Sequence, residues 1–301
     1  MTLRHLASMC LGSTLFLISA TALQADSELR RATHVDQEVA AVVEASRLLL
    51  MEAWEESGGF GGHSGSAMEA SQIDLDVSSL QDRAAERLVG GIEAPAHTAL
   101  LGFMASSAGE KYAWLRRELA TDSGQKYFQR HGRIIQERVP QERLAVLESV
   151  DQALGASTLQ RTIAGEMVDL VGLGAAQIAG LTGEPAEWDA PEAEISARLQ
   201  DLAAQRAFLR LTYGLNRMDE AELAALLAWA ESPAGQAFHA ARHDALLGVV
   251  TEVRERFVEA QQRMIDQELE EYRREDEEDE EDEEDEEDEE DEEDPEDDEE
   301  G

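Results

Sequence analysis

The chain has 301 residues and a formal charge of −41, with 66 acidic and 25 basic residues. So acidic a protein repels phosphate backbones, and nucleic acid is therefore excluded as an expected partner. The single cysteine, Cys10, lies in the N-terminal segment that we expect to be removed, and this excludes disulfides, thiol chemistry and cysteine-ligated zinc from the mature chain.

The first 25 residues have the three parts of a secretory signal peptide. Arg4 and His5 give a mildly basic start, residues 10–23 are almost wholly apolar or small, and Ala22 or Ala25 offers a cleavage point. The apolar stretch is shorter than the ~20 residues that a membrane helix needs. We therefore predict a cleaved signal peptide, a periplasmic or secreted protein, and no membrane span in the mature chain.

The body of the protein, residues 26–274, is rich in Ala, Leu, Glu, Gln and Arg, which favour helices. Strand signals are scarce, because no Asn-Gly or Asp-Gly hairpin separates alternating apolar runs. These features predict an all-α fold. The clearest helical stretches are residues 34–54, 80–90, 144–154, 159–181 and 191–211.

The body repeats one pattern, Leu-Leu-x-aromatic-x-x-Ser-x-Ala-Gly-x-x-aromatic, and a second match in the same order links residues 80–87 to 199–206. We predict two tandem copies of a helical unit, residues 26–140 and 141–274, which form two similar domains or one pseudo-symmetric bundle. A weaker echo of the pattern, from Ser123 to Tyr127, leaves the register of the first copy open. The motif residues are Leu100, Leu101, Phe103, Ser106, Gly109 and Tyr112 in the first copy, and Leu226, Leu227, Trp229, Ser232, Pro233, Gly235 and Phe238 in the second.

The repeated motif predicts two consecutive helices joined by a tight corner. In the second copy Ser232 is a good N-cap, and Pro233 suits the first helical position, where no amide donor is needed. Gly235 allows a close approach of the neighbouring backbone. We expect Trp229 and Phe238 to pack across the corner, so that the motif has a structural role.

A long helix is expected to follow this corner as far as about Arg274. Its apolar positions alternate in steps of three and four, as in a short coiled coil. This stripe packs either against the protein's own helices or against a second subunit or another partner. It consists of His239, His243, Leu246, Val250, Val253, Phe257, Ala260 and Met264.

The stretch from Leu226 to Phe238, with its Ser-Pro-x-Gly step after an acidic helix start, resembles the bacterial exported family named domain of unknown function 2059. The second copy matches from about Leu159 to Met264, whereas the first copy, about Thr33 to Glu137, has Ser107 where Pro233 would lie. The resemblance implies an all-helical, periplasmic protein. It implies no activity and no catalytic residue.

His239 and His243 lie one helical turn apart and are weak candidates for a metal site. A zinc site needs a third and usually a fourth ligand. The equivalent positions of the first copy hold Ala113 and Arg117, so the unit does not depend on the pair. Histidines packed in the core or at its rim are the alternative. We expect no catalytic residue and no cofactor.

The C-terminal segment, residues 275–300, consists of 25 Asp or Glu residues and Pro295. Such a run cannot bury apolar surface, and it predicts a disordered, self-repelling tail that binds divalent cations only weakly. Solubility or salt tolerance is the expected role of this tail, and capture of calcium or of a basic partner is the alternative. It lacks the glycine turn and ligand spacing of an EF-hand loop. We therefore expect a non-enzymatic interaction or envelope-associated structural module. The alternative is calcium buffering by the acidic tail.

Overall fold

The computed structural model describes residues 27–56, 75–182 and 192–290, and none of these residues lies in a strand. The all-α fold is confirmed, and each of the five clearest predicted stretches falls on a helix. The predicted signal peptide, 1–25, lies outside the described residues. The helices are α2 (Val35–Glu56), α4 (Val77–Gly90), α5 (Ala94–Met104), α6 (Ser107–Ala120), α7 (Asp122–Arg138), α8 (Gln141–Leu154), α9 (Ala156–Thr182), α10 (Glu192–Leu215), α11 (Glu220–Glu231) and α12 (Pro233–Glu290).

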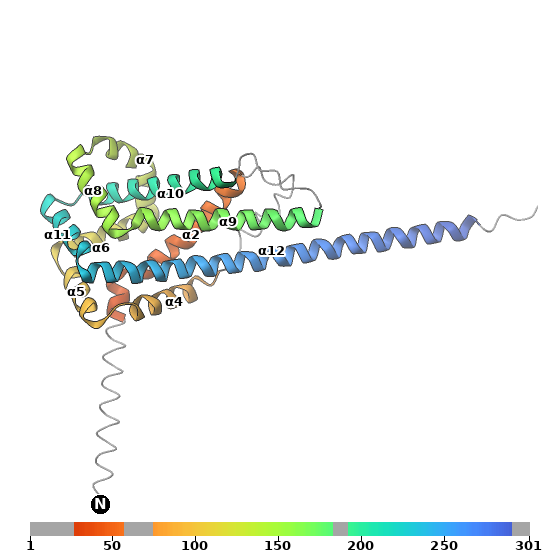
Figure 1. The fold of residues 1–301 in the computed structure, drawn as a ribbon, viewed down its shortest axis with the longest axis horizontal. Coiled ribbons are helices and arrows are strands. Elements are labelled where there is room, and N and C mark those ends of the chain that lie inside the picture. Colours follow the sequence, from red (N-terminus) through yellow and green to blue (C-terminus); the bar gives the residue numbers. More distant parts are fainter. Residues whose placement is uncertain (1–26, 57–74, 183–191, 291–301) are drawn as a thin grey trace, which may run out of the picture.

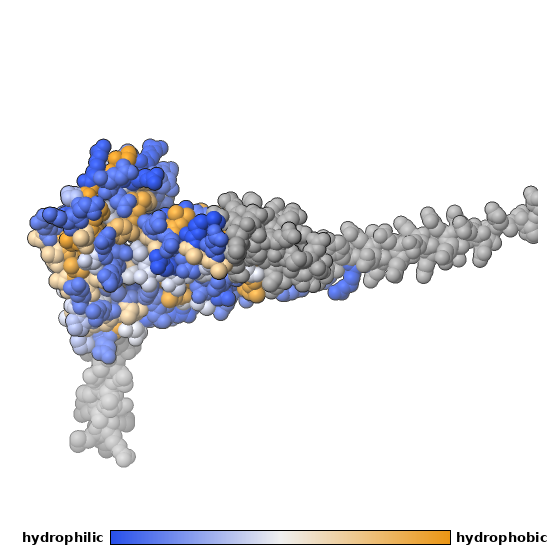
Figure 2. Space-filling model, turned by 45° about the horizontal axis from the view of Figure 1, so that its top comes forward, coloured by the Kyte–Doolittle hydropathy of each residue, from blue (hydrophilic) through white to orange (hydrophobic). Residues whose placement is uncertain are grey.

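The long helices lie roughly along one direction, and the short helices gather at one end of the bundle (Figure 1). The visible face of the bundle is mostly hydrophilic, with apolar patches between the hydrophilic residues (Figure 2). α9 and α10 form an antiparallel pair, and α12 packs against α2, α4, α5 and α9. Within the described ranges, no helix combines the length and apolar character that a membrane crossing requires.

One continuous hydrophobic core joins residues on both sides of the predicted boundary at 140/141. Leu100 and Leu147, which come from different sides, are both fully buried in it. Of the two arrangements that the repeat allows, this shared core favours one bundle. That the two segments are copies of one unit stays a prediction.

The second sequence match places equivalent side chains in the core. Leu80 and Ala84 are buried in α4, and Leu199 and Ala203 are buried in α10. In each case a short helix, a corner and a further helix follow in the same order. The two matched stretches are further apart along the chain in the second segment than in the first. The main reason is the length of the first helix, because α10 has 24 residues and α4 has 14.

The predicted stripe of α12 packs against the protein's own helices as far as Phe257. Leu246, Val250, Val253 and Phe257 are all buried in the shared core. The side chain of Met264 lies outside the described residues. Packing against a partner is therefore open only to the part of α12 that follows Phe257.

α12 continues beyond the predicted end near Arg274, since its backbone is helical as far as Glu290. Glu has a high helix propensity, and no proline interrupts the chain before Pro295. Carboxylates one turn apart repel one another, so charge opposes the helix in this acidic part. Figure 1 shows that this end of α12 projects beyond the other helices. Residues 291–301 lie outside the described residues.

Candidate functional site

The corner between α11 and α12 is closed by a serine and a glycine. The hydroxyl of Ser232 donates to the carbonyl of Trp229 at 2.6 Å and accepts from the N–H of Gly235 at 3.1 Å. A Cβ on Gly235 would lie 2.1 Å from the Trp229 carbonyl oxygen. Only glycine fits at this position without a movement of the backbone, and the tight corner predicted from the motif is present.

The corner between α5 and α6 has the same hydrogen bonds. The hydroxyl of Ser106 donates to the carbonyl of Phe103 at 2.6 Å and accepts from the N–H of Gly109 at 3.2 Å. A Cβ on Gly109 would lie 2.0 Å from the Phe103 carbonyl oxygen. Proline is therefore dispensable in this corner, because the serine and the glycine alone satisfy its backbone groups.

The two corners contact each other through their aromatic residues. The rings of Phe103 and Trp229 are stacked, with 4.2 Å between centroids and 5° between planes. Trp229 also meets Phe238 at 5.7 Å, which confirms that these two aromatics pack across their own corner. The first leucine of each pair, Leu100 and Leu226, is fully buried. The motif residues thus form one structural unit between the two segments.

The weak echo of the motif is a third corner of the same kind, between α6 and α7. Its cap is Thr121, whose hydroxyl donates to the carbonyl of Glu118 at 2.7 Å and accepts from the N–H of Gly124 at 3.1 Å. A Cβ on Gly124 would lie 2.0 Å from the Glu118 carbonyl oxygen. The shared signal is therefore Ser/Thr-x-x-Gly-x-x-aromatic, with Tyr127 as the aromatic residue here.

A buried carboxylate joins three helices near the paired corners. Glu38 of α2 accepts two hydrogen bonds from Arg242 of α12, at 2.7 and 2.8 Å, and a further one from Arg116 of α6. The three side chains are only 14–18% exposed. The Arg116 guanidinium also lies over the ring of Tyr112, 5.3 Å from its centroid. We call Glu38, Arg116 and Arg242 the charge cluster.

The two arginines keep the Glu38 carboxyl ionised. Burial alone would raise its pKa, but the positive charges of Arg116 and Arg242 outweigh burial and lower the pKa to about 2. In return, Glu38 raises the pKa of Arg242, against the opposing effect of burial. A carboxylate held in this form is a structural anchor and cannot act as a general acid near neutral pH.

The structure places the two candidate metal ligands beside the charge cluster. Burial, followed by the charges of Arg242 and Arg116, lowers the pKa of His239 to about 3, and burial and Arg242 lower the pKa of His243. The His239 ring packs edge-on against Trp229 and Phe238, at 5.1 Å from each. Among the described residues, no group of three or more His, Cys, Asp or Glu side chains is arranged to hold a metal. The neighbouring guanidiniums disfavour a bound cation further.

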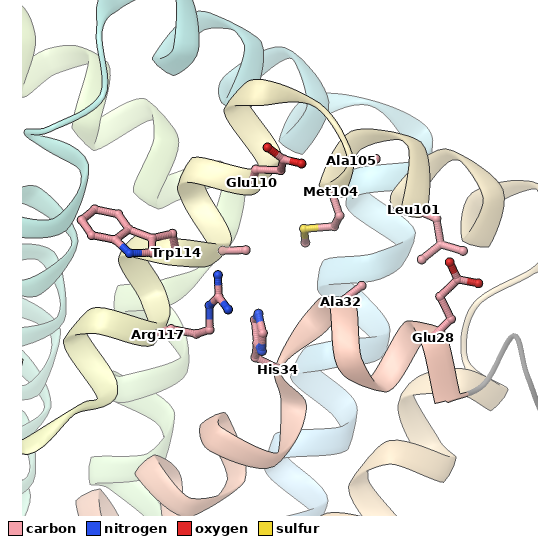
Figure 3. A pocket seen from close by; sticks show the side chains of 10 residues that line it. Glu28, Ala32, His34, Leu101, Met104, Ala105, Glu110, Trp114 and Arg117 are labelled. Carbon is pink, nitrogen blue, oxygen red and sulfur yellow. The ribbon is translucent and has the colours of Figure 1, made fainter.

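A surface hollow of about 550 Å³ lies where the chain enters α2 (Figure 3). His34, the turn residue between the helical residues 27–33 and α2, has a positive φ of 54°, and Figure 3 shows its ring close to the Arg117 guanidinium. Burial and then Arg117 lower the pKa of His34. The carboxylates of Glu28 and Glu110 lie on different sides of the hollow (Figure 3), so they form no catalytic pair.

The charge cluster was not predicted from the sequence. Its members belong to helices far apart in the chain, since Glu38 lies 78 residues from Arg116 and 204 residues from Arg242. The third corner could have been predicted from the sequence, because Thr121 and Gly124 have the same spacing as the serine and glycine of the other corners. That spacing predicts the start of α7, which the helical periodicity alone did not show.

Comparison with known proteins gives no match. No family model matches the chain, and the searches of curated proteins and of solved structures found no match either. The resemblance to domain of unknown function 2059 therefore stays a prediction that depends on the motif residues alone.

Proposed function

We propose that this chain is an exported, non-enzymatic interaction module of the bacterial envelope, and that its acidic segment is an arm for a basic partner. The observation that carries this proposal is the course of α12. The helix is held in the core as far as Phe257, and it then projects beyond the other helices with the acidic residues 275–290 (Figure 1).

A projecting helix separates the acidic charges from the rest of the protein. The body, residues 26–274, has 24 basic and 41 acidic residues, a net charge of −17, and residues 275–300 add 25 acidic residues. A concentrated charge of one sign attracts partners of the opposite sign and speeds their encounter. Such attraction weakens as salt screens it.

The most distinctive sequence pattern supports a structural role for the bundle. The serine, glycine and aromatic residues of the repeated motif close the corners, and Phe103 stacks on Trp229 between them. The charge cluster likewise binds α2, α6 and α12 to one another. These groups act on each other and hold the bundle as a rigid base for the arm.

Capture of partners from an envelope extract tests the proposal. Three baits are compared: the full chain, a deletion of residues 275–301, and a variant with Gln for Glu and Asn for Asp at 275–290. The first should retain basic proteins that elute with salt, and the other two should lose them. Equal capture by all three baits, or capture by none, would overturn the proposed role of the arm.

Export and cation binding are tested separately. Mass spectrometry of the protein from the cell envelope should find an N-terminus after Ala25 or Ala22, and a cytoplasmic chain that keeps residues 1–25 would contradict export.

The density of carboxylates in the arm favours calcium buffering as the second candidate. Calorimetric calcium uptake that disappears with residues 275–301, without any captured protein, would favour this candidate.

A further inference from the structure

α7 is the described helix with the largest positive charge, in a body that is otherwise acidic. It has four basic residues and two acidic ones, Asp122 and Glu137. All four basic side chains are exposed, and none of them takes part in an ion pair of the described residues, whereas the arginines of the charge cluster are held by Glu38. The basic residues are Lys126, Arg130, Arg133 and Arg138.

The same face of α7 exposes two large apolar side chains. Tyr127 is 50% exposed and Ile134 is 44% exposed, and they stand seven residues apart, on one side of the helix. The Tyr127 ring is held in place by stacking on His131, with 4.2 Å between centroids. Arg130 lies between them on the helix surface. A fixed aromatic ring among unpaired cations is typical of a binding surface.

We infer that this face of α7 binds the acidic segment, residues 275–290, of a second copy of the chain. The inference rests on the proposed function, because it names a basic partner for the acidic arm. Charge complementarity carries it: the exposed cations of α7 lack partners within the described residues, and the segment offers only carboxylates.

The fold directs this contact to another molecule. Figure 1 shows α7 at the end of the bundle where α12 begins, whereas the acidic segment lies at the projecting end of α12. The part of α12 between Pro233 and Glu275, where the acidic segment begins, spans about 63 Å at 1.5 Å per residue. A chain whose α12 is one continuous helix cannot fold its own arm back onto α7, but a second copy is free to bind there.

The contact is heterologous, because the two surfaces that meet are different. Each copy keeps a free α7 and a free arm at its two ends, so association continues into chains or closed rings. The net charge of the whole molecule opposes this assembly, and the local attraction dominates where surfaces approach within a Debye length, about 10 Å at ~0.1 M salt.

Sedimentation of the full chain tests the inference. The mass should rise with protein concentration at moderate salt and fall to that of the monomer at about 1 M salt, where the Debye length is about 3 Å. Replacing Lys126, Arg130 and Arg133 with Gln should weaken association about tenfold, since exposed ion pairs each contribute a modest part. The control replaces three exposed basic residues elsewhere, Arg31, Arg263 and Arg273, with Gln. It has the same net charge and should associate like the unmodified chain.

Mixing two deficient chains gives the decisive result. The deletion of residues 275–301 keeps α7, and the core is intact because its buried residues end at Phe257. The α7 variant keeps the arm. At a concentration where neither chain associates alone, the mixture should form a one-to-one complex, with circular dichroism confirming that both are folded.

A full chain that stays monomeric at every concentration would overturn the inference. So would equal weakening by the α7 variant and its control, or association that survives deletion of the arm. If arm-dependent capture of other proteins is nevertheless observed, the proposed function stands and only the second copy as partner is wrong.

Discussion

Loss of the Glu38 carboxylate should destabilise the protein more than loss of any exposed carboxylate. Glu38→Gln keeps the size of the side chain, but it leaves Arg116 and Arg242 without a counter-charge in a buried site. Breaking a buried ion pair by removing one partner typically costs about 3–5 kcal/mol.

The pKa of Glu38 gives a second measure of the same free energy. The pKa falls from 4.5 to about 2 on folding. One pKa unit corresponds to about 1.4 kcal/mol, so the ionised carboxylate contributes about 3 kcal/mol at neutral pH. Both routes give a few kcal/mol, a large part of the stability of a typical domain.

The pH dependence distinguishes this electrostatic effect from a packing defect. Because folding lowers the pKa of Glu38, its contribution is fully present above pH 4.5 and is lost as the pH falls toward 2. The difference in the free energy of unfolding between the unmodified chain and Glu38→Gln should therefore be about 3 kcal/mol at pH 7 and should shrink below pH 4.5.

Urea denaturation followed by circular dichroism measures this difference. Asp201→Asn is the matched control, because it removes an exposed ion pair with Arg161 in which the side chains are 65% and 53% exposed. That change should cost less than about 1 kcal/mol. Equal costs for the two substitutions, or a Glu38→Gln effect that stays constant from pH 7 to pH 3, would refute the reasoning.

Three further outcomes follow from the same structure. Folding lowers the pKa of His239 from 6.5 to about 3, so the unfolded chain gains a proton first and stability falls as the pH drops through this window. His239→Phe should abolish about 2 kcal/mol of the loss between pH 7 and pH 5 in urea titrations, and an unchanged pH profile would contradict this. Gly235→Ala should destabilise the protein by about 1–3 kcal/mol through the clash with Trp229. Gly102→Ala, where a Cβ meets nothing within 4 Å, should be neutral or stabilising in the same assay, and equal losses for both would be inconsistent with the corner geometry. Lowering the pH toward ~4 should increase the helical signal of residues 275–290, because protonated carboxyls no longer repel one another. The far-UV circular dichroism of the full chain minus that of the deletion of 275–301 measures this change, and a flat difference would show that repulsion does not limit the helix.

Local features could be predicted because they depend on residues close together in the chain. Ser232, Pro233 and Gly235 determine a corner through hydrogen bonds and a contact within a few residues, and the predicted corner is present. The periodicity of α12 likewise predicted the burial of Leu246, Val250, Val253 and Phe257, but it did not predict that Ala245 and Val249 are also buried. The spacing of Thr121 and Gly124 is the same local pattern, and it predicts the third corner.

Which buried faces meet depends on how the helices pack together. Helical periodicity shows that a face is covered, but it does not say which helix covers it, since many apolar faces are interchangeable. The stacking of Phe103 on Trp229 and the convergence of Glu38, Arg116 and Arg242 depend on how α2, α5, α6 and α12 pack together. The helical class, the corners and the acidic segment could therefore be predicted from residues that are close together in the chain. Only packing placed the carboxylate between its two arginines and set α7 at the opposite end of the bundle from the arm, because these relations join residues far apart in the chain.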